Sequence, residues 1–89
     1  MNQTIIDAIN SKTTLAFRYS NEKRIVEPHW YGRDTKGHDA LRAYQIGKGW
    51  RMFHISEITG LALGNSGFTQ PRPDYARGDK SMDQIYAQL

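Results

Sequence analysis

Apolar and polar residues alternate through three short segments in the middle of the chain, and turn residues separate these segments. The segments are residues 24–28, 40–44 and 50–58, with glycine in both intervening turns. A period of two is typical of strands that are buried on one face, and short turns place neighbouring strands antiparallel. This stretch therefore predicts an antiparallel meander, and the rest of the chain must consist of elements that pack on a small sheet.

The flanking segments add a helix and two further strands. An isoleucine stripe in residues 4–12 predicts a short helix that docks on the sheet. Residues 14–19 alternate cleanly before a polar turn, and residues 59–63 form a last strand after a single helical turn at 55–58. Pro28 cannot donate a ladder hydrogen bond, so it marks an edge position or a bulge.

One helix and five strands suggest a closed architecture, because closing short strands into a barrel leaves no exposed sheet edge. We expect a mainly β (α+β) fold: a small five-stranded antiparallel barrel with an N-terminal helix, followed by a C-terminal arm and helix. Val26 and Trp30 are expected on one side of their strand. The expected core, with the helix isoleucines as its lid, comprises Leu15, Phe17, Val26, Leu41, Phe53, Ile55, Ile58, Ile5, Ile6 and Ile9.

The composition changes after residue 63, which divides the chain into a barrel domain at 1–63 and a C-terminal part at 64–89. Glycine and proline interrupt residues 64–79 and predict an extended arm. Ser81 and Gln84 then form a capping box, which predicts a terminal helix. Its apolar face either folds back or binds a protein partner or a second copy of the chain, through Met82, Ile85, Tyr86 and Leu89.

Length and composition limit the class of protein. The 89 residues suit one small domain, which buries only about 60% of the surface that its unfolded chain exposes. The chain contains no cysteine, shows no secretory signal and has no apolar run near the ~20 residues that span a bilayer. We therefore expect a cytoplasmic protein without membrane contact, whose net charge of +3 weakly favours an anionic partner.

No arrangement of residues indicates catalysis. His29, His38 and His54 lack the paired spacing of a zinc site, and none lies at i, i+4 from another ligand in a helix. Ser66 is flanked by small residues but lacks the strand-turn-helix context of a nucleophile elbow. We therefore expect no enzyme activity, no metal and no cofactor.

The order and spacing of the predicted strands resemble the WYL domain, a module common in bacterial regulators. The resemblance covers roughly residues 4–63, and Asp39 and Ala40 occupy the places of the family's Trp and Tyr. The matching positions are Arg24, Val26, Glu27 and Pro28 in one strand, Leu41 and Tyr44 in the next, and Arg51, Phe53, Ile55 and Ile58 in the third.

This resemblance implies an Sm-like barrel that senses an effector, often a nucleic acid or a nucleotide, in transcription regulation. In the family the signal passes to an attached DNA-binding domain. The barrel leaves no room here for a helix-turn-helix. We therefore expect a free-standing ligand-binding module, or a module that works with another chain.

Basic and aromatic residues are interleaved on the predicted strands. Aromatic rings stack bases and arginines neutralise phosphates, so such a surface on a small barrel often binds single-stranded nucleic acid. We predict a face for an anionic ligand, such as single-stranded nucleic acid or a nucleotide. Its candidate residues are Tyr19, Arg42, Tyr44, Arg51 and His54.

Other interpretations of these residues stay open. Tyr44 is also compatible with a place in the core, and Arg42 with a solvated outer face. Arg51 shares a strand face with apolar residues and needs an anionic partner, either a ligand or an internal carboxylate such as Glu27 or Glu57. The alternative function is a structural or oligomerisation module with no ligand of its own.

Overall fold

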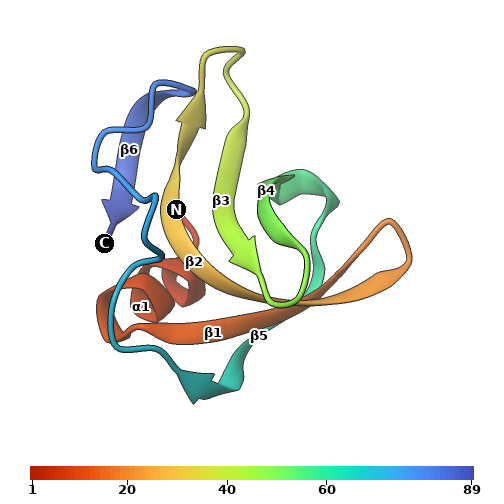
Figure 1. Ribbon diagram of the computed structural model, residues 1–89. Helices are drawn as coiled ribbons and strands as arrows, with labels where there is room; N and C mark the ends of the chain where they lie inside the picture. The colour runs from red at the N-terminus through yellow and green to blue at the C-terminus, as the bar shows by residue number, and fades with distance from the viewer.

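The longest strand, β2 (Glu22–Asp34), organises the fold because it pairs with three other strands. The computed structural model describes residues 1–89 (Figure 1). All strand pairs are antiparallel, in the order β4-β3-β2-β1-β5, and β6 joins β2. The other elements are α1 (Gln3–Ser11), β1 (Thr13–Tyr19), β3 (Asp39–Gln45), β4 (Gly49–His54), the 3-10 turn η1 (Ile55–Glu57), β5 (Thr59–Gly67) and β6 (Met82–Gln88).

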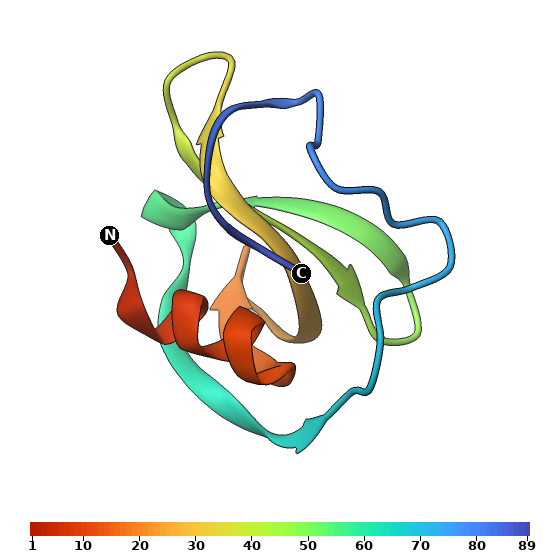
Figure 2. The same ribbon diagram turned by 90° about the vertical axis from the view of Figure 1, so that its left-hand side faces the viewer.

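β2 divides one of its edges between two partners. β1 pairs with residues 22–26 and β6 with residues 30–34, while β3 follows the opposite edge along residues 26–33. The resulting six-stranded sheet is strongly curved, and α1 lies across its open end (Figure 2). The end strands β4 and β5 do not pair with each other, so the expected closed barrel of five strands is not confirmed.

The β1–β2 hairpin shows how local sequence sets the register. Ser20 and Asn21 both adopt left-handed backbone angles, with φ of 52° and 63°. Two successive residues of positive φ match the twist of the flanking strands, as in a type I′ turn. Tyr19 then pairs with Glu22, and the register continues to Leu15 and Val26.

A bulge in β2 reverses the direction in which the side chains after residue 29 point. The pairing with β3 shifts between Pro28 and Trp30, which leaves His29 as the extra residue. Because one added residue moves every following side chain to the other face, Val26 points to the interior while Trp30 points outward. The bulge at Pro28 is confirmed, and the expectation that Val26 and Trp30 share a side is wrong.

The interior is one apolar cluster between the curved sheet and α1, called here the inner cluster. Asn2 caps α1 by accepting a hydrogen bond from the Ile5 backbone N–H at 3.2 Å. At nine residues, α1 is too short to cross a membrane. The predicted core is confirmed, with Ile6, Ile55 and Ile58 at its margin, and the inner cluster comprises Ile5, Ala8, Ile9, Leu15, Phe17, Val26, Tyr31, Leu41, Ala43 and Phe53.

The C-terminal residues form a strand, so the predicted terminal helix is wrong. β5 extends to Gly67, and the arm (residues 68–81) leads from it into β6 along the outside of the sheet (Figure 2). Ser81 does not cap a helix, because its hydroxyl donates to Asp79 Oδ1 at 2.8 Å. The free edge of β2 supplies backbone partners that a short isolated helix lacks, and it outweighs local helix propensity.

The apolar side chains of the C-terminal segment pack against the same chain. Met82 and Ile85 lie on the outer face of the sheet, whereas Tyr86 and Leu89 contact the inner cluster. Tyr86 meets Tyr31 edge to face, with ring centroids 5.0 Å apart. The segment therefore folds back, as one of the two sequence alternatives proposed, but in the form of a strand.

Candidate functional site

The outer face of the sheet carries a second apolar group, called here the outer cluster. Its buried members are Trp30, Ala40 and Met82, and the half-buried Trp50 and Tyr75 pack against them. Trp30 comes from β2, Trp50 from β4 and Tyr75 from the arm, so the arm completes a cluster that the strands begin. The ring centroids of Trp30 are 5.6 Å from those of Trp50 and 4.6 Å from those of Tyr75.

Arg42 and Tyr44 both lie on this outer face, as two residues of one strand separated by one position. The Arg42 guanidinium is 5.9 Å from the Trp30 ring centre, and its Nε is 3.4 Å from Asp79 Oδ2. The Tyr44 ring meets Trp50 edge to face at 5.8 Å. The structure thus brings together two of the predicted residues and adds two tryptophans to them.

Arg72 anchors the arm to β2. Its side chain forms two hydrogen bonds to Glu27, at 2.7 and 3.0 Å, and these raise the pKa of Arg72. The guanidinium also lies 4.0 Å from the centre of the Tyr44 ring. Planar arginine matches a carboxylate and an aromatic face at the same time, so Arg72 clamps the arm to both.

The bulge residue His29 completes this anchor. Its Nδ1 lies 2.8 Å from the Glu27 carbonyl oxygen and therefore carries the proton, while Nε2 accepts a hydrogen bond from the Arg72 backbone N–H at 3.1 Å. The residue is fully buried, and this burial lowers the pKa of His29. The neutral imidazole is thus the form that holds the arm.

Two further arm residues satisfy polar groups of the outer cluster. Asp74 Oδ2 accepts a hydrogen bond from Trp50 Nε1 at 2.9 Å. The Tyr75 hydroxyl donates to the Leu89 carbonyl oxygen at 2.5 Å, and burial raises the pKa of Tyr75. These arm residues were not predicted; their only signal in the sequence is that charged and aromatic side chains interrupt a segment rich in proline and glycine.

The arm buries polar atoms of the outer cluster without giving all of them a hydrogen-bond partner. Trp30 Nε1 is buried without an acceptor, and the buried Asp79 Oδ2 forms an ion pair with Arg42 Nε at 3.4 Å but no well-aligned hydrogen bond. Buried polar atoms usually find a partner, and an unpaired one costs about 1–3 kcal/mol. The outer face therefore retains one unused donor, Trp30 Nε1, beneath the arm.

Arg51 lies on the other face of the sheet. It pairs with Ala43 of the inner cluster, so its side chain starts on the inner side, and it extends into solvent without an ion pair. The two candidate internal partners interact elsewhere: Glu27 binds Arg72, and Glu57 faces His54. The structure therefore separates Arg51 from Arg42 and Tyr44.

Tyr19 and His54 meet at the end of β4, where His54 pairs with Ala40 of the outer cluster and the Tyr19 ring packs against the inner cluster. The Tyr19 hydroxyl accepts a hydrogen bond from the His54 backbone N–H at 3.2 Å and lies 3.5 Å from Glu57 Oε2. The Tyr19 ring packs edge to face on Phe53, with centroids 5.0 Å apart. These two predicted residues form a separate group with Glu57.

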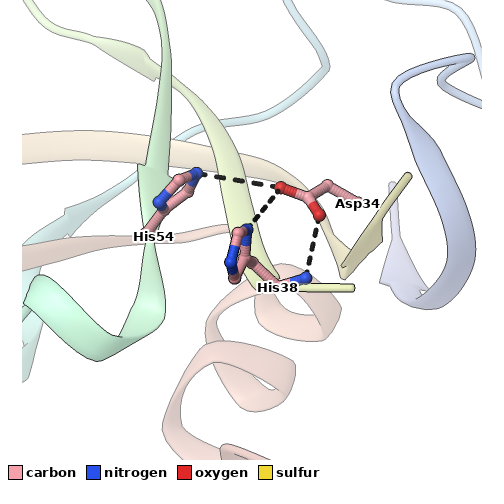
Figure 3. Close-up of side chains that lie close together, drawn as sticks. All are labelled: Asp34, His38 and His54. Atoms are coloured by element: carbon pink, nitrogen blue, oxygen red, sulfur yellow. Dashed lines mark hydrogen bonds and ion pairs between the residues drawn. The ribbon is translucent and has the colours of Figure 1, made fainter. Parts of the chain in front are cut away.

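The His54 ring faces Asp34 and His38 at the end of the β2–β3 hairpin (Figure 3). Asp34 Oδ2 lies 3.6 Å from His38 Nδ1 and 3.7 Å from His54 Nε2. The backbone N–H groups of His38 and Lys36 donate to Asp34 Oδ1, and these bonds lower the pKa of Asp34. Helical spacing rules miss this group, because a turn joins Asp34 to His38 and strand pairing brings in His54.

Comparison with known proteins gives one structural likeness. No protein-family model matches the chain, and no curated protein matches it. A solved structure, Proteasome accessory factor B/C (PafBC) of Arthrobacter aurescens, is similar with a TM-score of 0.71 and 26% sequence identity. The similarity covers 84% of this chain but only 13% of the PafBC chain, so it concerns one small part of that protein.

Proposed function

We propose that this chain is a WYL-like regulatory module that binds an anionic ligand, such as single-stranded nucleic acid or a nucleotide, on the face of Arg42, Tyr44 and Trp50. The likeness to PafBC, together with the resemblance of the strands to the WYL domain of bacterial regulators, supports a regulatory role. The ligand class rests on one observation. Carboxylates of the arm already contact this face, Asp79 at Arg42 and Asp74 at Trp50.

The contacts of the arm resemble those that a nucleotide would make. Asp79 Oδ2, 3.4 Å from the Arg42 guanidinium, stands where a phosphate oxygen would be neutralised. The flat guanidinium of Arg72, 4.0 Å from the Tyr44 ring centre, occupies a position where a base can stack. A ligand with negative charges next to flat rings would replace the Asp79 carboxylate at Arg42 with a phosphate and the Arg72 guanidinium at Tyr44 with a base.

Binding on this face requires the arm to move. The arm competes through its own carboxylates, and its cover leaves Trp30 Nε1 without an acceptor. A ligand that supplies an acceptor to this N–H gains a hydrogen bond that the arm does not provide. The arm thereby sets a threshold, because only a ligand that binds better than Asp74 and Asp79 opens the face.

The test measures the affinity of the pure protein for a fluorescent single-stranded oligonucleotide by anisotropy across a salt series. Asp74→Asn together with Asp79→Asn should tighten binding, because both competing charges are gone. Adding Arg42→Ala in this background should weaken binding and reduce the salt slope by about one contact. Adding Tyr44→Ala should cost about 1–3 kcal/mol, largely independent of salt.

Arg51 provides the matched control. It is an arginine on the strand next to Arg42, but it lies on the opposite face. Arg51→Ala should therefore leave the affinity close to that of its parent. Equal losses for Arg42→Ala and Arg51→Ala would place binding elsewhere, and no salt-dependent binding by the folded Asp74→Asn, Asp79→Asn protein would refute the ligand class.

The alternative, a structural module that oligomerises, relied on the apolar side chains of the C-terminal segment. Met82 is buried in the outer cluster, and Tyr86 and Leu89 contact the inner cluster. An assembly that used them would have to pull β6 from β2. Sedimentation over a range of concentrations tests this alternative directly, because it requires a larger species.

A further inference from the structure

Three side chains with metal-binding atoms converge where the β2–β3 hairpin meets the end of β4 (Figure 3). Asp34 ends β2, His38 lies in the turn, and His54 ends β4. One ligand atom from each lies within 4.8 Å of the other two. We propose that Asp34, His38 and His54 bind a divalent transition-metal ion, with Zn²⁺ the best match. This differs from our expectation of no metal, which used sequence spacing alone.

The distances suit a tetrahedral ion. Zinc binds histidine nitrogen and carboxylate oxygen at about 2.0–2.2 Å, which places neighbouring tetrahedral ligands roughly 3.3–3.5 Å apart. Asp34 Oδ2 is 3.6 Å from His38 Nδ1 and 3.7 Å from His54 Nε2. All three ligand atoms lie within 4.8 Å of one another, so side-chain rotations of the two histidines would bring the set to zinc-ligand distances.

The hairpin turn orients the carboxylate in advance. Asp34 Oδ1 accepts hydrogen bonds from the backbone N–H groups of Lys36 at 2.9 Å and His38 at 2.8 Å. These bonds fix the carboxylate and leave Oδ2 directed at the two imidazoles. Only 13% of the Asp34 side chain is exposed. Asp34, which faces both histidines, is therefore the most buried of the three ligands.

His54 has the outer partner that a metal-binding histidine usually has. Its Nδ1 lies 3.4 Å from Glu57 Oε2, and Glu57 in turn lies 3.5 Å from the Tyr19 hydroxyl. Metal-binding histidines commonly donate their second ring N–H to a carboxylate, which fixes the tautomer and orients the ring. Glu57 thus directs His54 Nε2 towards Asp34, and this gives Tyr19 and His54 a role separate from the ligand face of Arg42 and Tyr44.

The site is open on one side. Three protein ligands leave the fourth tetrahedral position to water or to a ligand atom. The His38 and His54 side chains are 58% and 40% exposed, and a shallow depression lined by Gly37, His38, Asp39, Ile55 and Ser56 adjoins them. An ion reaches this site from solvent. Two imidazole nitrogens and one carboxylate oxygen suit a borderline metal such as Zn²⁺ better than Mg²⁺, which prefers oxygen ligands.

The experiment titrates tag-free protein with Zn²⁺ at pH 7.5 and follows the histidine ring nitrogens by NMR. The ring signals of His38 and His54 should shift together, whereas those of the buried His29 should not, which gives a control within the same molecule. Mg²⁺ at the same concentration should leave all three unchanged. Co²⁺ should give the visible absorption of a four-coordinate site.

Two substitutions separate the metal site from simple histidine–carboxylate pairing. Asp34→Asn keeps an oxygen for the two backbone N–H groups but removes the ligand charge, and it should weaken Zn²⁺ binding more than tenfold. Glu57→Gln should weaken it about tenfold as an outer partner. Asp7→Asn, an exposed carboxylate on α1, should change nothing.

Unshifted His38 and His54 rings at millimolar Zn²⁺ would overturn the proposal. Equal affinities for wild type and Asp34→Asn would do the same. If Asp34→Asn fails to fold, the ring signals of the wild type and the affinity of Glu57→Gln decide the matter alone.

Discussion

The two faces of this sheet hold two clusters of different chemistry. In the inner cluster, Phe17 and Phe53 meet edge to face with centroids 5.0 Å apart, and its ten buried members are all apolar except for the hydroxyl of Tyr31. In the outer cluster, each large ring has a polar tip. Trp50 depends on Asp74 for its acceptor, and Trp30 has none.

The difference lies in what closes each cluster. The inner cluster is covered by α1 and by the strands of the sheet, and its contacts are mainly apolar. The outer cluster is covered by the arm, which is held by the ion pair of Arg72 with Glu27 and by a hydrogen bond to His29. Interactions of this kind respond to competing ions and to pH, so the outer face can open while the inner core stays intact.

The largest expected effect comes from breaking the inner cluster. Phe53 is 1% exposed and packs against both Phe17 and Tyr19. Phe53→Ala should lower the free energy of unfolding by about 3–5 kcal/mol, which is a large part of the stability of a small domain. Urea denaturation followed by circular dichroism measures this loss. A variant that melts within a few degrees of wild type would show that Phe53 contributes little to the core.

A smaller effect is expected where β6 meets β2. A Cβ atom on Gly32 would collide with the Gln84 backbone carbonyl, because the two strands approach closely there. Gly32→Ala should therefore cost about 1–3 kcal/mol, as overpacking does, and should loosen β6. Hydrogen exchange of residues 82–88 should then quicken more than exchange in β1.

A truncated chain gives the control for this substitution. In a protein that ends at residue 79, β6 is absent and Gly32 has no close neighbour from it. Gly32→Ala should then have little effect on stability. An equal cost in both backgrounds would mean that the strain arises within β2 itself.

The smallest expected effect is a dependence on pH. It should loosen the cover of the outer cluster and leave the inner cluster intact. Burial lowers the pKa of His29 in the folded protein, so the unfolded chain binds the extra proton first as the pH falls. The contribution of neutral His29 is complete above its unfolded pKa of about 6.5 and is lost progressively below it. Acid should therefore release the arm, because protonated Nε2 cannot accept from the Arg72 N–H.

Tryptophan fluorescence measures this release, since both tryptophans belong to the outer cluster. The emission should shift to the red between neutral and mildly acidic pH before the far-ultraviolet circular dichroism changes. His29→Gln should remove this early transition. A single transition shared by both signals would show that the two clusters open together.

The sequence predicted what local spacing controls. The alternation of Leu15 and Phe17 and the polar turn at residues 20–23 determined a hairpin, and the structure places both side chains in the inner cluster. Pro28 marked the bulge correctly. The sequence could not predict that Trp30 lies on the outer face. The direction of its side chain depends on which residue the bulge leaves unpaired, and pairing with β3 determines that residue.

The outer face depends on contacts between distant residues. Asp79 contacts Arg42, and Asp74 contacts Trp50. The two residues of each pair lie far apart in the sequence, so no sequence motif links them. Residues 81–89 show helical spacing, yet they pair with β2 because its edge is free beyond residue 29. Local preference is weak in so short a segment, and tertiary pairing decides its form.

The position of β6 also implies an order of assembly. The hairpins of the meander join residues a few positions apart, whereas Gly32 of β2 pairs with Ile85, 53 positions later. Hairpins form on the order of 1–10 μs, and longer loops close with a greater loss of chain entropy. We therefore predict that the meander acquires its register first during refolding, and that Trp30 and Trp50 become buried only when the arm and β6 pack on the sheet. The face that we propose for a ligand would then be the last apolar surface to become buried during folding.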